Sequence, residues 1–442
     1  MTSADTRIAV AHLMRRAGFG APAAQVDRIA AGGYLDAVDG LVAGLTERDA
    51  AADALPEPTF DTAGQLAARI GTQAEKQAAR RQARREANDL VLWWLRRMAV
   101  AEQPLREKLT LLWHDHFATS IQKVKLPALM HAQRATLYDL GPGRFDRLLS
   151  AMVTDPAMLV WLDGVDNVAG TPNENFAREL FELFTLGHGH AGHAGGQPYG
   201  EADVRAAARA FTGWKLDGDG TIARLRPRLH DAATKTVLGV TGPLGGDDVV
   251  RVATAQPACA PHVVSRLWSR IGRSAGPDDP TVMALAEPFA EDLDVAALLR
   301  RMFLHPDFLS ARTRQGLVKT PIDLVVGIAR TLDQQISAHH LTALQALGHV
   351  PFLPPDVAGW PADEGWLSTS SAQARLAHAV TTAAAADVAA LGTADAAERV
   401  ASTARLLGVE VWGRTSAATL SAVTDPHELL TLALVAPEHV MA

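Results

Sequence analysis

Apolar residues recur three and four positions apart along most of the chain, which is the spacing of one face of an α-helix. The pattern is clear in "DLVLWWLRRMAV", "REKLTLLWHDHF" and "TPIDLVVGIARTLDQQI", and it continues through the Ala-rich part at 376–442. Alternating runs typical of strands are few, and only the Gly-rich "KTVLGVTGPLGGDDVV" could hold a short hairpin. The sequence therefore predicts a mostly α fold, a single large helical unit over 1–442 with at most a short hairpin.

A long charged helix is expected within 60–100. Its first half carries a row of cationic side chains along one side: Lys76, Arg80, Arg81, Arg84 and Arg85. We interpret this row as a solvated face and not as a patch for an acidic partner, because the formal net charge of the whole chain is -7.

A narrow polar stripe runs along the segment "TPNENFARELFELFTLG". Asn175, Arg178, Glu179 and Glu182 are spaced so that they share about 100° of a helix surface, with Phe and Leu on both flanks. Buried carboxylates need cations, a metal ion or hydrogen-bond donors as partners. We therefore expect the stripe to face a polar interior, either as part of a functional site or as a structural network tied by Arg178.

The ends of this stripe helix are also expected from the sequence. Thr171 is a natural N-cap, Pro172 suits the first helical position, and Glu174 completes a capping box. Gly187 stands where a left-handed residue commonly ends a helix.

Two histidines in "WHDHFATS" are candidate ligands for a divalent metal. His114 and His116 end a helix that is expected to begin near Pro104. On a continuous helix their side chains point away from each other, so they could share an ion only if the helix stops near His114. Core packing or capping is the competing interpretation.

Further polar groups follow the helix expected in "YGEADVRAAARAFTGW". This helix carries Arg209, with Trp214 just beyond its Gly213 stop, and the next segment "HDAATKTVLG" brings His230, Asp231 and Lys235. Such groups serve proton transfer and the binding of an anionic oxygen. They also form good salt bridges, and both interpretations stay open.

The run "LGHGHAGHAGG" carries His188, His190 and His193 between glycines. We expect a surface loop there, because a flexible loop holds a fixed catalytic ligand poorly.

Composition narrows the classes of function. The chain is acidic overall, so nucleic acid and anionic membranes are not expected partners. Cys259 is the only cysteine, which excludes an intrachain disulfide and predicts a small core residue. Without a signal peptide or membrane span, the chain is expected to be soluble and cytoplasmic. Nucleotide-binding and serine-nucleophile motifs are absent.

The chain resembles the domain-of-unknown-function-1800 family over almost its entire length. The matching segments occur in the expected order: "HLMRRAGFGA", "REKLTLLWHDHFATS", "DPAMLVWLDG", "PNENFARELFELFTLG", "YGEADVRAAARAFTGW", "HDAATKTVLG", "LVKTPIDLVVG" and "FLPPDVAGWPADEGWLSTSSAQAR". The resemblance implies a single helical unit, frequent export of relatives, and a neighbouring gene for a sulfatase- or phosphatase-like protein. This chain departs from relatives in having no export signal and in an insertion at the His-rich run.

The family segments add three residues to the candidate site. They are Lys319 and the two tryptophans of "GWPADEGWL", Trp360 and Trp366. The tryptophans could stack on a sugar or another ring, or they could fill a gap between helices.

We expect an enzyme that acts by hydrolysis or transfer on a polar saccharide, sulfated or phosphorylated substrate. Proton transfer is assigned to Glu179 or Glu182 with His230 and Asp231. The remaining roles are substrate binding (Asn175, Arg178, Arg209, Trp214, Lys235, Lys319, Trp360 and Trp366) and metal ligation (His114 and His116). The alternative is a non-catalytic helical partner protein whose charged residues form a structural network.

Overall fold

The structure is a computed structural model, and it describes residues 2–188, 198–392 and 395–441. Helices account for most of these residues, as the three-and-four spacing of the apolar positions predicts. The predicted mostly α fold is confirmed.

The helices of the first third are α1 (Ser3–Arg16), α2 (Ala23–Gly32), α3 (Tyr34–Ala43), α4 (Ala50–Asp53), α5 (Thr62–Ala67), α6 (Gln73–Val100), α7 (Pro104–His116), α8 (Ile121–Val124) and α9 (Pro127–Leu140). The middle third contains α10 (Phe145–Val153), α11 (Pro156–Trp161), α12 (Asn175–Glu179), a π-helical segment η3 (Leu180–Thr185), α13 (Glu201–Ala210), α14 (Gly246–Thr254), α15 (Cys259–Ile271), α16 (Pro280–Asp292) and α17 (Val295–Leu304). The last third contains α18 (Pro321–Thr331), α19 (Ala338–Leu347), α20 (Thr369–Ala384), α21 (Ala396–Leu407), α22 (Arg414–Ala422), α23 (Pro426–Val435) and α24 (Pro437–Val440).

Two small antiparallel hairpins interrupt the helices, where the sequence predicts at most one. The predicted hairpin pairs β3 (Lys235–Val237) with β4 (Val240–Gly242) through Leu238 and Gly239, which both have positive φ, as a two-residue turn requires. The other pairs β1 (Trp214–Leu216) with β2 (Ala223–Leu225). Its strands are three residues long, too short for an alternating pattern to stand out in the sequence.

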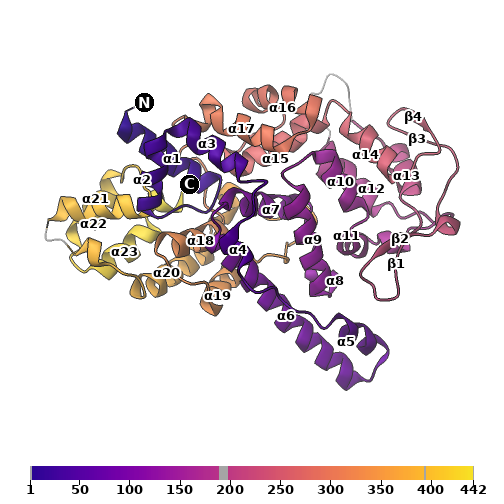
Figure 1. The fold of residues 1–442 in the computed structure, drawn as a ribbon, viewed down its shortest axis with the longest axis horizontal. Helices are drawn as coiled ribbons and strands as arrows, with labels where there is room; N and C mark the ends of the chain where they lie inside the picture. Colours follow the sequence, from indigo (N-terminus) through magenta and orange to yellow (C-terminus); the bar gives the residue numbers. More distant parts are fainter. Residues whose placement is uncertain (1, 189–197, 393–394, 442) are drawn as a thin grey trace.

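The elements are arranged around a central α7 (Figure 1). In this view α1, α2 and α20 to α23 lie on the left, α15 to α17 above, and α10 to α14 with both hairpins on the right. The helix α6 runs downward with α5 as an arm.

Shared helices join the buried apolar clusters into one interior. On α7, Trp113 packs in the cluster that contains α10 and α15, whereas Leu111 packs in the one that contains α6 and α19. On α18, Val325 and Ile328 likewise belong to different clusters. A helix that is apolar on most sides is expected to be buried between other elements. Helices α7 and α18 both lie between other elements in this way.

The segment 60–100 forms two helices, not one. The short α5 and a 3₁₀ turn come first, and α6 then begins after Thr72, which forms a capping box with Glu75. The cap supplies acceptors for the free N–H groups of the first turn, so the helix begins there. Of the basic row, Arg80, Arg81, Arg84 and Arg85 are exposed and Lys76 is partly exposed.

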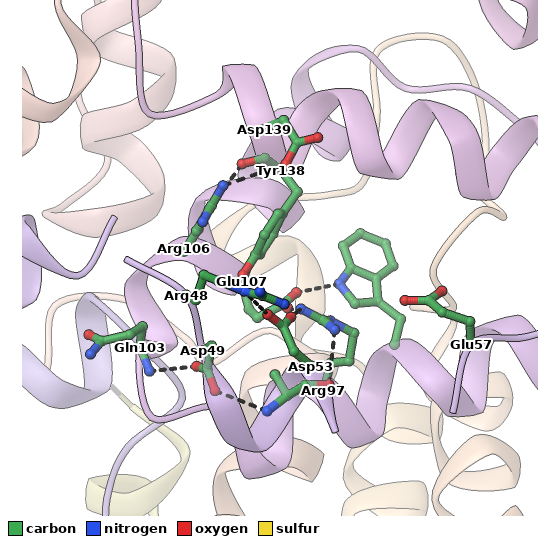
Figure 2. A network of polar contacts seen from close by, with 12 residues as sticks. Arg48, Asp49, Asp53, Glu57, Arg97, Gln103, Arg106, Glu107, Tyr138 and Asp139 are labelled. Atoms are coloured by element: carbon green, nitrogen blue, oxygen red, sulfur yellow. Dashed lines mark hydrogen bonds and ion pairs between the residues drawn. The ribbon is translucent and has the colours of Figure 1, made fainter. Parts of the chain in front are cut away.

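An ion network is buried where α6, α7 and α9 meet (Figure 2). The Glu107 carboxylate accepts hydrogen bonds from Arg97 Nε at 2.8 Å, from Arg134 Nη2 at 2.5 Å and from Trp94 Nε1 at 2.9 Å. Arg97 also donates to Asp53 near the end of α4. Because every strongly buried charge here has an opposite partner, this network ties three helices together.

Among the described residues, no helix combines the length and the apolar character that are needed to cross a lipid bilayer.

Candidate functional site

The stripe helix begins later than the sequence predicts. Helix α12 starts at Asn175, and its N-terminus has no side-chain cap; Thr171 instead forms an isolated β-bridge with Val168. The predicted cap at Thr171 and first turn at Pro172 are therefore wrong. The predicted end is confirmed, because Gly187 has a φ of 75°.

The second half of the stripe helix is π-helical. In η3 the Leu186 N–H donates to Phe181 O, five residues back, instead of four. The wider turn leaves the carbonyl groups of Leu183 and Phe184 available to side chains, and two histidines form hydrogen bonds with them. His116 Nε2 lies 3.1 Å from Phe184 O, and His262 Nε2 lies 2.8 Å from Leu183 O. His116 thus holds the π-helical segment against the end of α7.

The stripe faces the molecular surface and not a polar interior. The side chain of Arg178 is 36% exposed and pairs with Glu174 and, through both amino groups, with Glu201 on α13. Asn175 is exposed and donates to Asp163. The expectation that the stripe faces a polar interior is therefore wrong. The flanking Phe and Leu side chains fill the interior and leave the polar stripe at the surface.

The two stripe carboxylates have different surroundings. Glu182 forms an ion pair with His188. Glu179 is partly buried, and burial together with the nearby Glu182 raises the pKa of Glu179 above its ordinary value. The other two predicted loop histidines, His190 and His193, lie outside the described residues.

Glu179→Gln is expected to leave the free energy of unfolding within about 0.5 kcal/mol of the original protein, or slightly above it. Because the pKa of Glu179 is raised in the folded state, the ionised side chain destabilises the fold at neutral pH, and this contribution fades as the pH falls. Urea unfolding at about pH 7 measures the effect. A loss of several kcal/mol would instead reveal a structural ion network around Glu179.

The condition for a metal shared by His114 and His116 is not met. Helix α7 continues through His116, so the two imidazoles leave the helix in different directions. His114 Nε2 accepts a hydrogen bond from Phe352 N–H at 2.9 Å, and burial lowers its pKa to about 3. Within the described ranges, no group of three or more His, Cys, Asp or Glu side chains is arranged to hold a metal ion.

The predicted cluster after α13 is joined by internal contacts. Arg209 pairs with Asp231 at 2.6 Å, and the Lys235 ammonium donates to the carbonyls of Asp231 and Leu244. His230 Nδ1 lies 2.9 Å from Thr212 O. These contacts attach the loop before β3 to the end of α13 and use most of the donors that were expected to bind substrate.

The predicted tryptophans divide between two regions. Trp214 lies on β1, opposite Leu225 in the first hairpin. Trp360 and Trp366 are buried near the start of α20, where the Trp366 ring stacks on His349 at 4.9 Å and the Trp360 ring lies 5.0 Å from the same imidazole.

The loop that carries Trp360 is held by Asp115 on α7. The Asp115 carboxylate accepts a hydrogen bond from Trp360 N–H at 2.8 Å and pairs with Arg270 of α15 at 2.6 Å. Gly359 has a φ of 92°, and a β-carbon there would lie 2.5 Å from Asp115 O. Only glycine can occupy this position without moving the backbone.

Two small adjoining pockets lie beside this loop, and both are partly open to solvent. We name the first the arginine pocket; its charged lining residues are Arg15, Arg16, Lys108, Arg270, Lys319, Asp323 and Asp363. The second, the tryptophan pocket, is lined by Trp360, Trp366, His349, Leu111 and Pro361, among others. Both share Lys108, Arg270, Thr320 and Asp323, so they form adjacent parts of one site.

Local sequence features place the charged groups of the arginine pocket. Arg15 and Arg16 occupy the last turn of α1, where cations interact favourably with the helix dipole. Thr320 caps α18, with Pro321 in its first turn, and accepts a hydrogen bond from Asp323 N–H. The Asp323 carboxylate then accepts hydrogen bonds from Thr320 Oγ1 and from Lys108 on α7.

Lys319 differs from the other cations of this pocket. It is only 8% exposed, and among the described residues its ammonium group has no hydrogen-bond or ion-pair partner. Burial lowers the pKa of Lys319 well below its ordinary value, and the positive charge of the nearby Arg15 is the second cause. Both causes disfavour the charged ammonium form of this side chain in the folded protein.

The structure does not bring the predicted site residues together. Figure 1 shows α12 and α13, which carry the stripe and Arg209, on the right, and α1 and α18, which border the arginine pocket, on the left. Of the predicted residues, Lys319, Trp360 and Trp366 line these two pockets. Sequence reasoning missed Arg15, Arg16, Lys108 and Arg270, although the segments "HLMRR" and "REKL" that contain the first three stood within the family resemblance.

Comparison with known proteins identifies a family and no individual relative. A family model described as "Protein of unknown function (DUF1800)" matches residues 12–441. No curated protein and no solved structure matches the chain. With a match over nearly its whole length, the chain belongs to the DUF1800 family.

Proposed function

We propose that this protein binds the oxyanion group of a polar substrate in the arginine pocket and acts on that substrate by hydrolysis or transfer. A phosphorylated or sulfated compound fits this chemistry. The observation that supports the proposal most strongly is the charge of the lining, in which four cationic residues besides Lys319 face two carboxylates. A bound oxyanion would offset this excess.

The free donors of the pocket support the same ligand class. Arg16 is buried and uses one amino group on Thr313 O, but its Nε has no partner in the part of the chain that the structure describes. Buried donors without acceptors cost free energy, and guanidinium groups match the geometry of phosphate and sulfate oxygens. An oxyanion would therefore satisfy groups that the protein itself leaves unsatisfied.

The adjoining tryptophan pocket suits the uncharged part of the substrate. Its aromatic and apolar walls could cover a sugar or another ring, as proposed for Trp360 and Trp366. In its neutral form, which burial favours, the amine of Lys319 can accept a proton or attack an electrophile, and either step serves transfer chemistry. Neighbouring genes for sulfatase- or phosphatase-like proteins, which the family resemblance implies, favour the same substrate class and make such a protein a candidate partner.

Inorganic phosphate and sulfate are expected to stabilise the protein, by about 2.7 kcal/mol at 100 times the dissociation constant. Arg16→Met should abolish most of this stabilisation, because the change removes a guanidinium that lines the pocket and whose Nε has no partner among the described residues. Thermal unfolding at constant ionic strength, adjusted with sodium chloride, measures both effects.

Arg300→Met is the matched control, since Arg300 is a surface cation with a side chain 46% exposed. It should respond to phosphate as the original protein does. Equal stabilisation by chloride, or undiminished stabilisation of Arg16→Met, would contradict oxyanion binding in this pocket. For catalysis, turnover of p-nitrophenyl phosphate or sulfate should fall by about 10² or more in Lys319→Met.

A further inference from the structure

We infer that Lys319 is a nucleophile that forms an imine with a carbonyl group of the substrate. The inference rests on the proposed function and narrows it, because the substrate would then be an aldehyde or ketone that also carries a phosphate, sulfate or similar oxyanion.

The position of Lys319 sets it apart from other lysines that are withdrawn from solvent. Lys108 pairs with Asp323, Lys215 donates to Val165 O, and Lys235 donates to two carbonyls. Lys319 has no such partner among the described residues, although it is buried, as Lys108 and Lys235 are. A buried amine with nothing to hold its proton is suited to react as a base or nucleophile.

The backbone of Lys319 is fixed even though its amine is free. Its N–H donates to Val440 O at 2.9 Å, and its carbonyl accepts a hydrogen bond from Arg375 Nη2 at 3.2 Å. The next residue, Thr320, caps α18. A nucleophile on a fixed backbone loses little conformational freedom when a substrate binds, which favours attack.

Lys319 also stands where two cavities meet. Besides the arginine pocket, it lines a second small pocket on the side of α2 and α21, together with Arg15, Asp323 and His439. Its amine therefore borders space on both sides, with guanidinium groups beside it. An oxyanion held by Arg15 and Arg16 would place the rest of a small substrate next to this amine.

The electrostatics agree with this geometry. Burial is the main cause of the lowered pKa of Lys319, and the positive charges of Arg15, Arg375 and Arg16 lower it further, against the opposing effect of Asp323. A neutral amine keeps the lone pair that attack on a carbonyl requires.

The covalent step is balanced without any oxidant or reductant. The lone pair of Lys319 Nζ forms a bond to the carbonyl carbon, and the carbonyl oxygen takes up a proton to give a carbinolamine. The proton on the oxygen of the carbinolamine comes from the amine. The hydroxyl group then leaves with the second amine proton as water, and a carbon–nitrogen double bond remains. Hydrolysis of the imine reverses these steps and frees the lysine.

The test uses pyridoxal 5′-phosphate as a probe, because it combines an aldehyde with a phosphate. The full-length protein is treated with the probe at about pH 7, reduced with sodium borohydride, digested, and analysed by peptide mass spectrometry. We expect Lys319 to be modified roughly tenfold or more above exposed lysines such as Lys123, since each unit by which a pKa falls gives tenfold more free amine. Inorganic phosphate should suppress the adduct, and pyridoxal without phosphate should label Lys319 far less.

Lys319→Arg keeps a long basic side chain but cannot form the adduct, so it serves as the control for labelling elsewhere. An adduct confined to exposed lysines overturns the inference, and so does equal labelling of Lys319 by pyridoxal and by its phosphate. If phosphate stabilises the protein but Lys319 stays unmodified, oxyanion binding stands and the imine is wrong. If neither occurs, the proposed function fails with it.

Discussion

The free energy of unfolding is expected to fall by about 3 to 5 kcal/mol when Glu107 is replaced by Gln, because two buried guanidinium groups then lose their counter-charge. Glu107 is 1% exposed, and Arg97 and Arg134 are 3% and 5% exposed. Burial by itself would raise the pKa of Glu107, but Arg134 and Arg97 outweigh it and lower the pKa, so the carboxylate is ionised at neutral pH. The amide of Gln keeps the shape of the side chain and removes the charge. Urea unfolding at about pH 7 measures the loss.

A surface ion pair supplies the matched control for this charge removal. Arg300 and Asp39 are paired at 2.7 Å, but their side chains are 46% and 47% exposed. Asp39→Asn should therefore cost less than about 1 kcal/mol. Similar losses for the two variants would show that burial does not govern the contribution of Glu107.

Acidification from about pH 7.5 to about pH 5.5 is expected to lower the free energy of unfolding by on the order of 5 kcal/mol. Burial lowers the pKa of several histidines below the ordinary value of an imidazole, among them His12, His114, His116, His349 and His439. They stay neutral in the folded protein, while the unfolded chain takes up protons on them below about pH 6.5. Protonation therefore favours the unfolded state, and each histidine contributes a loss of up to about 1.4 kcal/mol per pH unit.

One substitution tests the origin of this pH dependence. His349→Phe keeps an aromatic ring against Trp366 and removes one titrating group. The fall in the free energy of unfolding over the same pH range should therefore be smaller by about 1.3 kcal/mol. Phe184→Leu, which alters a fully buried residue without an ionisable group, should lower stability equally at both pH values. A stability that is constant between the two pH values would mean that these histidines are accessible to protons in the folded protein.

The ends of helices and turns were predictable where they depend on the preferences of adjacent residues. The start of α7 at Pro104, the helix α13 before Gly213, the left-handed Gly187 and the second hairpin at Leu238 and Gly239 all follow the sequence. Each depends on the preferences of a few adjacent residues: proline at a first turn, glycine at positive φ, or apolar spacing.

The stripe helix shows where a local pattern misleads. The spacing of Asn175, Arg178, Glu179 and Glu182 assumes 3.6 residues per turn throughout, but η3 is wound more widely. A polar line with aromatic flanks also does not say which side the rest of the chain covers. The structure covers the flanks and leaves Arg178 at the surface, paired with Glu201 from a different helix.

The sequence by itself determined the mostly α fold, a few helix ends, and the residue types of the candidate chemistry, because these depend on interactions between residues a few positions apart. Only the tertiary structure decided that Arg16, Lys108, Arg270 and Lys319, from four separate segments, border one pocket. It also decided that Lys319 has no partner there while Lys108 has Asp323. Which charges meet depends on how the helices pack against one another, and no local pattern of residues records that packing.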